Sequence, residues 1–427
     1  MHVSYFTPTH DASQLRRVYE SLERQSSENW KWVVLANGGT LRKEHLGWLK
    51  TVRFADRIEV HDYDRLGSQN IGAIKNHAAS LCDGEILAEL DHDDEITSNC
   101  TDHLLKAFED PTVDFVYSDC AEVCDDGKVR PHYPAELGWS YRTEQVDGRS
   151  MEVCESFPAS PASFSRIWYA PNHIRAWRNS FYWKIGGHNH AFDVLDDQEL
   201  LCRTYIHGNV RHIDRCLYIY HLTGKNTCYL PGTNEKIQKL TLELHENFAL
   251  QLSSRWSDIN KLHKVDICCW NHKVRSDFIG VDVNTKSLAD VVADLNSTWP
   301  FKDGSVGVVH ASDALEHLRD PVHTMSEIYR ILAPGGWLIS NTPSTDGRGA
   351  FQDPTHVSFW NSNSFWYYTR RQTAAYIGHP VRFQAVHINN YFPSQWHIEN
   401  HIPYVRADLI KLSGEFPRKM TPGRIEI

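Results

Sequence analysis

Residues 85–96, with the sequence EILAELDHDDEI, decide how the rest of the chain is interpreted. The run at 85–90 is apolar and has the length of a buried strand. Asp91, Asp93 and Asp94 follow it within four positions. In an open α/β sheet the carboxyl end of a strand opens into the ligand crevice, and hard oxygen ligands suit Mg²⁺ or Mn²⁺. The stretch therefore predicts a divalent-metal site at a strand end; the alternative is an acidic loop that caps the next helix.

The same alternation of strands and helices extends over the first part of the chain. Hydrophobic spacing predicts strands at 2–6, 30–35, 57–60 and 85–90 and helices at 11–25 and 71–81. A polar cluster follows each strand, so these clusters gather at one edge of the sheet. The pattern indicates an α/β fold with a mostly parallel sheet, helices on both faces, and a nucleotide at that edge.

Four stretches in this region carry a resemblance to a known family. They are FTPTH at 6–10, ANGGT at 36–40, NIGAIKNHAAS at 70–80 and DGEILAELDHDDEI at 83–96. In this order they resemble a family 2 glycosyltransferase of the GT-A fold, over roughly residues 1–230. The resemblance implies metal-dependent transfer of a sugar from a nucleotide-diphosphate donor, with inversion at the anomeric carbon. The metal would neutralise the charge on the leaving diphosphate.

The resemblance also implies roles for individual residues. The DXD motif of the family maps to Asp91-His92-Asp93, which makes Asp91 and Asp93 metal ligands. The positions implied for donor binding are Thr7, Pro8, Thr9, Asn37, Lys75, Asp91 and His92. Asn37 stands where the family more often has Asp, but its carbonyl can still accept an N–H of the base. We expect uracil as the base and a UDP-sugar as the donor.

The stretch HIRAWRNSFYWKIGGHNHAFDVLDDQELLCRTYIHG at 173–208 resembles the second signature of the same family. In the family an acidic pair after a Gly-Gly turn supplies the general base that removes the acceptor proton. We expect this base to be Asp197, with Asp196 as the next candidate. The alternative is that both residues cap the positive end of the helix predicted at 198–207.

Two further segments complete this domain. In the family a His or Arg in the closing loop approaches the metal or the diphosphate, which would make His221, together with Lys225, a candidate for that role. A lone His is more often structural, so this alternative stays open. Residues 124–166, rich in Pro, Ser and charge, predict an irregular excursion over the acceptor side.

A second α/β pattern follows a helix predicted at 233–256. We expect a first domain at 1–232, a helical connector at 233–262 and a second domain at 263–427. Strands are predicted at 277–282, 306–310 and 337–341, with a helix at 328–332. The stretches FIGVDV at 278–283, ADLNSTWPFKDGSVGVVHASDALEHL at 293–318, EIYRILAPGGWLISNTPS at 327–344 and FQDPTHVSFW at 351–360 resemble a Rossmann-like S-adenosylmethionine-dependent methyltransferase.

The cofactor motif of that family is altered in this chain. Cys268, Cys269 and Trp270 stand where the resemblance places glycines. Side chains there would fill cofactor space or prevent the positive φ that glycine permits. Asp282 matches the acid that binds the cofactor ribose. We expect no S-adenosylmethionine binding, and a structural, acceptor-binding or oligomerising role that leaves a homo-oligomer open.

Composition limits the functional classes. The chain has 427 residues, 41% of them hydrophobic, and a formal charge of −10, which argues against a sequence-independent nucleic-acid binder. Neither a signal peptide nor an apolar run of 18 residues is found, and the cysteines form no CxxC pair, so a cytoplasmic location is expected.

The leading hypothesis is a glycosyltransferase with a glycan-type acceptor and a methyltransferase-like appendage. One alternative is a bifunctional glycosyltransferase and methyltransferase. Another is a glycosyltransferase acting on nucleic-acid bases, or a DNA-bound module. A non-catalytic carbohydrate-binding protein is opposed by the complete set of acidic motifs.

Overall fold

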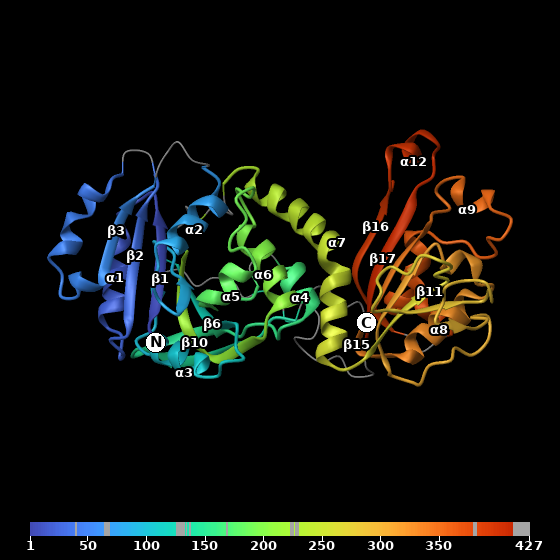
Figure 1. Ribbon diagram of the computed structural model, residues 1–427, viewed down its shortest axis with the longest axis horizontal. Coiled ribbons are helices and arrows are strands. Elements are labelled where there is room, and N and C mark those ends of the chain that lie inside the picture. Colours follow the sequence, from blue (N-terminus) through green and yellow to red (C-terminus); the bar gives the residue numbers. More distant parts are fainter. Residues whose placement is uncertain are drawn as a thin grey trace. The chain divides into compact units, whose positions relative to one another are not determined.

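The computed structural model describes residues 1–38, 41–63, 69–124, 133, 135, 138–167, 170–222, 226, 230–378 and 382–412. The chain forms two compact units, one within residues 1–248 and one that begins at Ala249. Each unit is built around its own sheet (Figure 1). The division falls inside helix α7 (Thr233–Ile259), in the region where the sequence predicts a connector.

The first unit begins as a parallel sheet with its helices. Its first strands are β1 (Val3–Thr9), β2 (Trp30–Ala36), β3 (Ile58–Asp62) and β4 (Ile86–Glu89), in the spatial order β3-β2-β1-β4. The helices that accompany them are α1 (Leu15–Glu23), α2 (Ile71–Ser80) and the 3-10 segments η1 (Lys43–Lys50) and η2 (Ala55–Arg57). The predicted α/β pattern is confirmed here.

Beyond β4 the sheet becomes mixed. Strand β9 (Arg175–Arg178) lies antiparallel between β4 and β6 (Phe115–Cys124), although it is distant from both in sequence. The remaining elements are β5 (Glu95–Ile96), β7 (Tyr141–Val146), β8 (Arg149–Cys154), β10 (Val210–Leu222), α3 (Cys100–Phe108), α4 (Pro161–Ser165), α5 (Asn179–Lys184) and α6 (Asp196–His207). The insertion of β9 brings residues from the second signature next to the strand that carries the DXD motif.

Strand β1 is longer than its sequence pattern predicts. The pattern ends the strand at residue 6, whereas β1 continues through Pro8 to Thr9. Its pairing with β4 stops at Phe6, and only β2 pairs with it from Thr7 onward. Pro8 therefore sits where one side of the strand has no ladder, which is where a strand tolerates a residue without an N–H.

The segment 124–166 is not irregular throughout. In its described part, β7 and β8 form a hairpin, and α4 follows. The two turn residues Asp147 and Gly148 both have positive φ, 47° and 77°. Asp-Gly with two positive φ values is the preferred two-residue hairpin turn, so the prediction of an irregular excursion is wrong for these residues.

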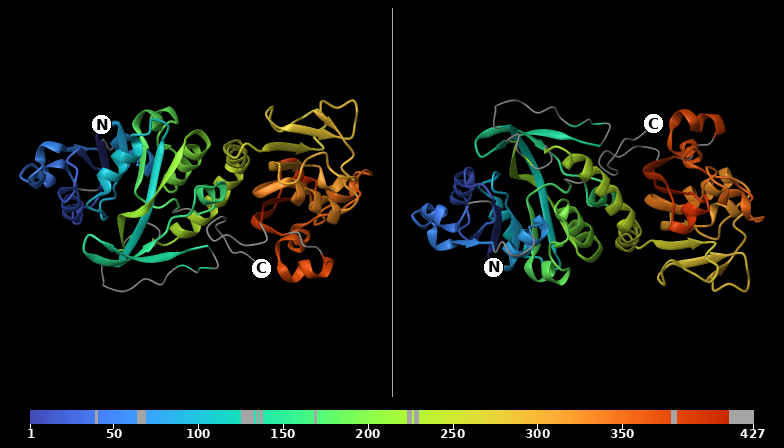
Figure 2. Two further views of the ribbon diagram at one scale, coloured as in Figure 1. Left: turned by 90° about the horizontal axis from the view of Figure 1, so that it is seen from below. Right: turned by 90° about the horizontal axis from the view of Figure 1, so that it is seen from above.

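The second unit contains the sheet β13-β12-β11-β14-β15-β17-β16. Its ribbon is coloured yellow to red in Figure 2. Its strands are β11 (His263–Ile267), β12 (Ile279–Asp282), β13 (Val291–Val292), β14 (Val306–Ser312), β15 (Leu332–Pro343), β16 (Phe383–Tyr391) and β17 (Tyr404–Lys411). The helical segments are η5 (Leu315–His317), α8 (Pro321–Ile331), α9 (Gly349–Gln352), η6 (Ser362–Phe365), α10 (Trp366–Thr369), α11 (Arg371–Ile377) and α12 (Gln395–Glu399). Strands β13 to β15 are parallel, and β17 is antiparallel to both of its neighbours.

Helix α8 starts earlier than the predicted helix at 328–332. The side chain of Asp320 accepts hydrogen bonds from the backbone N–H groups of Val322 and His323, and Pro321 occupies the first helical position. An Asp cap followed by Pro is a strong helix start. The α/β prediction is also confirmed for this unit.

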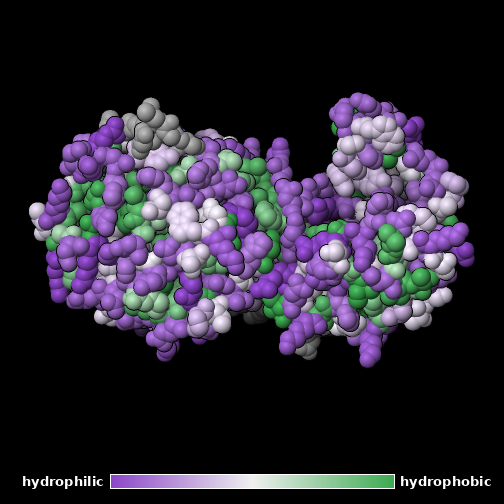
Figure 3. Space-filling view, viewed as in Figure 1, coloured by the Kyte–Doolittle hydropathy of each residue, from purple (hydrophilic) through white to green (hydrophobic). Residues whose placement is uncertain are grey.

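The surface of the units mixes polar and apolar residues on the face shown in Figure 3. Among the described residues, no helix is long and apolar enough to cross a membrane.

Candidate functional site

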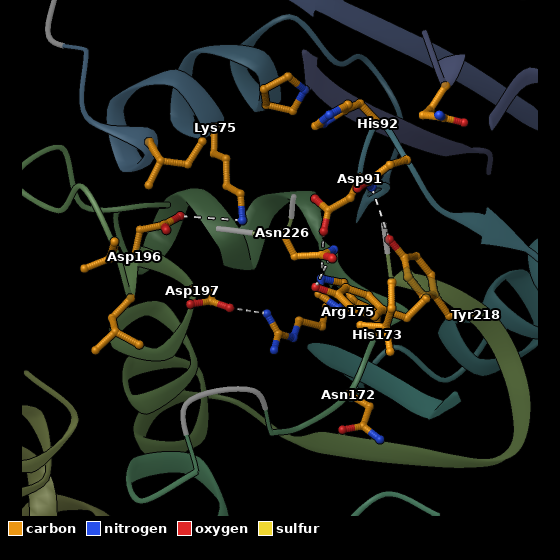
Figure 4. A pocket seen from close by; sticks show the side chains of 18 of the residues that line it. Lys75, Asp91, His92, Asn172, His173, Arg175, Asp196, Asp197, Tyr218 and Asn226 are labelled. Atoms are coloured by element: carbon orange, nitrogen blue, oxygen red, sulfur yellow. Dashed lines mark hydrogen bonds and ion pairs between the residues drawn. The ribbon is translucent and has the colours of Figure 1, made fainter. Parts of the chain in front are cut away.

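A cavity of about 720 Å³ opens in the first unit where β1, β2 and β4 end. Its walls come from the ends of these strands, from α2, from the start of β9, from the first turn of α6 and from β10. Figure 4 shows the side chains that point into it. The cavity therefore lies at the carboxyl edge of the sheet, where the sequence pattern predicts a nucleotide.

The acidic stretch after β4 divides into two parts. The residues of the DXD motif, Asp91 to Asp93, line the cavity. Asp94 instead is fully buried, and its carboxylate accepts hydrogen bonds from the Tyr218 hydroxyl and the His221 backbone N–H, both at 2.7 Å. Asp94 thus anchors the loop to β10, and the two acids before it remain available for a ligand.

Ionisation of Asp91 is opposed by its surroundings. Burial raises the pKa of Asp91 to about 6, with Glu89 and Asp93 adding to the effect and Lys75 opposing it. A carboxylate in such a position favours a nearby cation.

The acidic pair Asp196 and Asp197 forms the first two residues of α6, and both line the cavity. Asp197 lies 2.5 Å from Arg175 Nη1, and its other oxygen accepts the backbone N–H of Gln198 at 2.8 Å. Burial works to raise the pKa of Asp197, but the charge of Arg175 outweighs it and holds the pKa below the ordinary value. Asp197 thus accepts one N–H of the first turn of α6 and also lines the cavity.

Asp196 has a different environment from its neighbour. Its Oδ2 lies 3.7 Å from Lys75 Nζ and 3.6 Å from His188 Nε2, and it has no hydrogen-bond partner among the described residues. Burial raises the pKa of Asp196 despite Lys75 and His188. The pKa of Asp196 is thus raised, whereas the pKa of Asp197 is lowered.

Lys75 extends from α2 into a cluster of carboxylates. Its Nζ lies 3.2 Å from Glu89 Oε1, and Glu89 also contacts His188 Nε2 at 2.9 Å. Burial works to lower the pKa of Lys75, but Asp196 and Glu89 outweigh it and raise the pKa well above its ordinary value. Lys75 therefore stays charged, and part of its charge is neutralised by the protein itself.

The structure adds Arg175, His173 and Tyr218 as site residues, to which the sequence pattern gives no role. Arg175 is buried and pairs with Asp197. His173 stacks on Tyr218 with ring centroids 4.9 Å apart, and its Nε2 lies 4.0 Å from Asp91 Oδ2. Burial, with the charge of Arg175, lowers the pKa of His173 to about 3, so its imidazole is neutral. The sequence signal for Arg175 is its place directly before Ala176 and Trp177 in the run RAWR, because an arginine that is buried with such neighbours requires a partner.

Three predicted site residues do not line the cavity. The Thr7 hydroxyl donates to the Leu90 carbonyl at 2.6 Å, and the Thr9 hydroxyl donates to the Asp11 carbonyl at 2.7 Å; both are buried. His221 is buried with its Nε2 2.8 Å from Glu95 Oε1. These side chains support the strand ends and do not line the cavity, whereas the sequence predicts donor contacts for Thr7 and Thr9 and a metal contact for His221.

The other predicted donor-binding residues lie at the cavity. Pro8, Asn37, Lys75 and His92 all line it. The Oδ1 of Asn37 is buried and has no hydrogen-bond partner among the described residues. Lys225, named beside His221 in the sequence analysis, falls outside the described residues.

The second unit has its own cavity of about 790 Å³, at the carboxyl ends of β11, β12 and β14. Cys268, Cys269 and Trp270 line it, where the resemblance places glycines. The prediction that side chains there prevent a positive φ is wrong, because Cys268 and Trp270 have φ of 53° and 43°. Asp282 accepts hydrogen bonds from the backbone N–H groups of Trp270 and Asn284, one on each oxygen.

Comparison with known families agrees with both resemblances. Residues 4–164 match the family model described as glycosyl transferase family 2, and residues 264–340 match the model described as methyltransferase domain. The first unit therefore contains a stretch that matches glycosyl transferase family 2, and the second contains a stretch that matches a methyltransferase domain.

Matches to individual curated proteins are short. A probable S-adenosylmethionine-dependent methyltransferase of Mycolicibacterium smegmatis is 32% identical over 93 residues, which are 21% of this chain and 33% of that protein. An uncharacterized 37.1 kDa protein in transposon TN4556 of Streptomyces fradiae is 34% identical over 64 residues, 14% of this chain and 19% of that protein. The chain thus spans a third or less of these relatives.

Solved structures show a distant similarity. S. aureus TarS 1–349 in complex with UDP-GlcNAc is 16% identical, covers 60% of this chain and 72% of that chain, and superposes with a TM-score of 0.43. The mannosyltransferase PcManGT from Pyrobaculum calidifontis, in complex with GDP-Man and Mn²⁺, is 16% identical, covers 58% and 64%, and gives a TM-score of 0.39.

Proposed function

We propose that the first unit transfers a sugar from a nucleotide-diphosphate donor, a UDP-sugar, to a hydroxyl group of a glycan-type acceptor. The transfer uses a divalent metal ion and inverts the anomeric carbon. One observation carries the proposal: the acids after β4 and the acids that open α6 face the same cavity. A metal-binding pair and a proton-accepting pair on one crevice are what such a transfer needs.

The cavity has the charge and the ligands for a hard divalent ion. Its described walls contain seven carboxylate residues and, as permanent cations, Lys75 and Arg175, each already beside a carboxylate. Asp91 and Asp93 supply oxygen ligands of the kind that Mn²⁺ and Mg²⁺ prefer. When bound there, the ion would offset the negative charge that develops on the leaving diphosphate.

The donor base would lie over Pro8 and Asn37. The unpartnered Oδ1 of Asn37 can accept a hydrogen bond, and the N3–H of uracil is a suitable donor. Leaving this buried oxygen unpaired costs free energy that a bound base would recover. This supports a uridine nucleotide.

Asp197 is the proposed general base. Its carboxylate faces the cavity and stays ionised at neutral pH because Arg175 lowers its pKa. As the acceptor oxygen bonds to the anomeric carbon, Asp197 takes the hydroxyl proton, and the bond to the diphosphate oxygen breaks on the opposite face. Asp196 is the more buried of the two and acts by holding Lys75.

The acceptor would occupy the part of the cavity beside β10. Tyr218, Tyr220, Asn172 and Asn226 line it there. The ring of Tyr220 with the neighbouring amides suits a sugar, which offers both C–H surfaces and hydroxyl groups. Tyr218 is fully buried and stacks on His173, so it supports this wall.

For the second unit we propose a supporting role without S-adenosylmethionine. Cys268, Cys269 and Trp270 place side chains in the cavity where a cofactor would need close backbone approach. The carboxylate of Asp282, which matches the ribose-binding acid, already accepts two backbone N–H groups.

Thermal unfolding with constant Mn²⁺ tests both proposals together. The ligands are UDP, GDP, CDP, dTDP, S-adenosylmethionine and S-adenosylhomocysteine, and a ligand at 100 times its Kd stabilises the folded state by about 2.7 kcal/mol. We expect a Mn²⁺-dependent shift with UDP, lost in Asp93→Ala and kept in Glu44→Ala, a change at an exposed acid of the same unit. No nucleotide shift in the unmodified protein would refute the donor assignment, and a shift with S-adenosylhomocysteine would make the protein bifunctional.

Measurement of turnover distinguishes the general base from residues that only bind the donor. UDP release from a UDP-sugar should fall by roughly 10²–10⁴-fold in Asp197→Asn, while the UDP-induced thermal shift remains. Unchanged turnover in this variant would move the base to another residue.

A further inference from the structure

Three side chains that commonly bind transition metals meet in the second unit. Glu316 and His317 belong to η5, and His356 lies in the loop after α9. Their ligand atoms all lie within 4.8 Å of one another. None of them takes part in the glycosyltransferase site, which lies in the first unit.

Glu316 has an unsatisfied carboxylate. The residue is 1% exposed, and its Oε2 accepts a hydrogen bond from the Thr342 hydroxyl at 2.6 Å. Its Oε1 is buried without a hydrogen-bond partner, and within the described parts of the chain no lysine or arginine forms an ion pair with it. A buried carboxylate oxygen without a partner is costly unless a cation neutralises it.

The two histidines are oriented by backbone carbonyls. His317 Nδ1 lies 3.2 Å from the Thr355 carbonyl, and His356 Nδ1 lies 3.2 Å from the Ala350 carbonyl. A hydrogen on Nδ1 donates to the carbonyl and leaves the Nε2 lone pair free. Metal-bound histidines usually have such a second partner, which sets the tautomer and the orientation of the ring.

Hydrogen bonds to backbone carbonyls hold η5 and the loop that contains His356 together without any ligand. The Glu316 carbonyl accepts hydrogen bonds from the N–H groups of Val357 at 2.8 Å and Ser358 at 3.0 Å. The Ser358 hydroxyl donates to the Leu315 carbonyl at 2.9 Å. Because these bonds fix the loop on η5, His356 stays next to Glu316 and His317, and little ordering is required to form a site.

We propose that Glu316, His317 and His356 bind one divalent transition-metal ion, with Zn²⁺ preferred. Two imidazole nitrogens and one carboxylate oxygen suit Zn²⁺ and disfavour Mg²⁺ or Ca²⁺. Ligands of a tetrahedral Zn²⁺ lie roughly 3.4 Å apart for bonds of about 2.1 Å, so side-chain rotations must close the present separation.

The site would keep an open position. Three protein ligands leave a fourth coordination position for water or a bound molecule, as in catalytic rather than structural zinc sites. His317 lines the cavity of the second unit, and so does its neighbour Thr355. The ion would therefore present a Lewis-acidic position to that cavity.

Metal titration of the full chain tests the proposal. The protein is stripped with a chelator and titrated with Zn²⁺ against a competing chelator, and with Co²⁺, whose visible absorption reports histidine ligation. Asp93→Ala serves as the background, so that the site proposed in the first unit does not contribute. We expect one equivalent of Zn²⁺ and a Co²⁺ absorption band in this background.

Substitutions at the histidines are the deciding comparison. His317→Asn and His356→Asn should each weaken Zn²⁺ binding on the order of 100-fold and abolish the Co²⁺ band. His323→Asn is the matched control, because His323 lies on α8 of the same unit outside the cluster. No stoichiometric Zn²⁺ uptake in the background protein, or equal affinity in the three histidine variants, would overturn the proposal. Neither outcome affects the UDP-dependent shift of the first unit, so the two proposals fail separately.

Discussion

Replacement of Arg175 by methionine tests the electrostatic structure of the cavity. Arg175 is buried and lies 2.5 Å from Asp197 and 3.9 Å from Glu89. Its Nε also donates to the Pro171 carbonyl at 2.9 Å. Methionine keeps most of the volume and the flexible stem but removes the charge and all of these donors.

The expected cost follows from burial. Removing one partner of a buried ion pair costs about 3–5 kcal/mol, because the other charge stays buried and unpaired. An exposed pair is worth about 0–1 kcal/mol. Since about 1.4 kcal/mol is a factor of ten, local opening around β9 and α6 should become roughly 10²–10⁴-fold more frequent.

Amide hydrogen exchange of the full chain measures this opening by mass spectrometry. Peptides from β9 and α6 report on local opening within the first unit alone. The measurement therefore does not assume that both units unfold in a single transition. Arg57→Met is the matched control: Arg57 lies 2.6 Å from Glu28, which is 64% exposed. Both variants remove one arginine from a short ion pair, one buried and one with an exposed partner, although Arg57 also lies over the rings of Trp30 and Phe54.

The destabilisation caused by Arg175→Met should also depend on pH. With Arg175 present, the pKa of Asp197 is lowered, so the pair stabilises the fold above the ordinary carboxyl range and loses this effect as pH falls through the lowered pKa. Without Arg175, protonation of Asp197 relieves the unpaired charge, so Arg175→Met should be less destabilised at pH 4 than at pH 8. Equal exchange in Arg175→Met and Arg57→Met, or a deficit that does not change with pH, would refute the reasoning.

Three further predictions concern the same unit. Because burial raises the pKa of Asp91 to about 6, apparent Mn²⁺ affinity, measured by calorimetry in the presence of UDP, should fall about tenfold per pH unit below that value; constant affinity down to pH 5 would contradict it. His221→Gln should leave Mn²⁺ affinity unchanged but lower the thermal midpoint, because its ring supports Glu95 and does not line the cavity; loss of Mn²⁺ binding in a folded variant would restore the metal-ligand role. Asn37→Ala should weaken UDP binding about tenfold, by roughly 1.4 kcal/mol, without loss of thermal stability, and an unchanged Kd would remove Asn37 from the base site.

Much of the first unit can be predicted from local patterns. Strand β4 and helices α2 and α6 have clear hydrophobic periods; the acids at 91 and 93 follow the end of β4, those at 196 and 197 open α6, and Lys75 lies within α2. Since strand ends of one sheet meet at one edge, their convergence follows from the pattern alone. The pairing of β9 with β4 joins segments distant in sequence, and no local period encodes it. Arg175 and His173 reach the cavity only through that pairing.

The misplaced residues have a simple cause. Thr7 and Thr9 lie two positions apart in a strand, so they share one face, and Pro8 between them takes the other. The sequence pattern ends the strand at residue 6 and therefore treats all three as a loop that surrounds the nucleotide. Once β1 is known to continue to Thr9, alternation alone separates Pro8 at the cavity from the two buried threonines.

The carboxylate of Asp282 has a structural role that does not depend on any ligand. Its two oxygens accept hydrogen bonds from the backbone N–H groups of Trp270 and Asn284, so the acid links two loops. A change from Asp282 to Ala would remove both hydrogen bonds, so the two loops depend on this acid whether or not a ligand binds there. Each carboxylate oxygen has a second lone pair, so these two bonds and a hydroxyl donor can share the same carboxylate. The presence of this acid is therefore explained by its backbone hydrogen bonds and is not by itself evidence for a ribose-binding site.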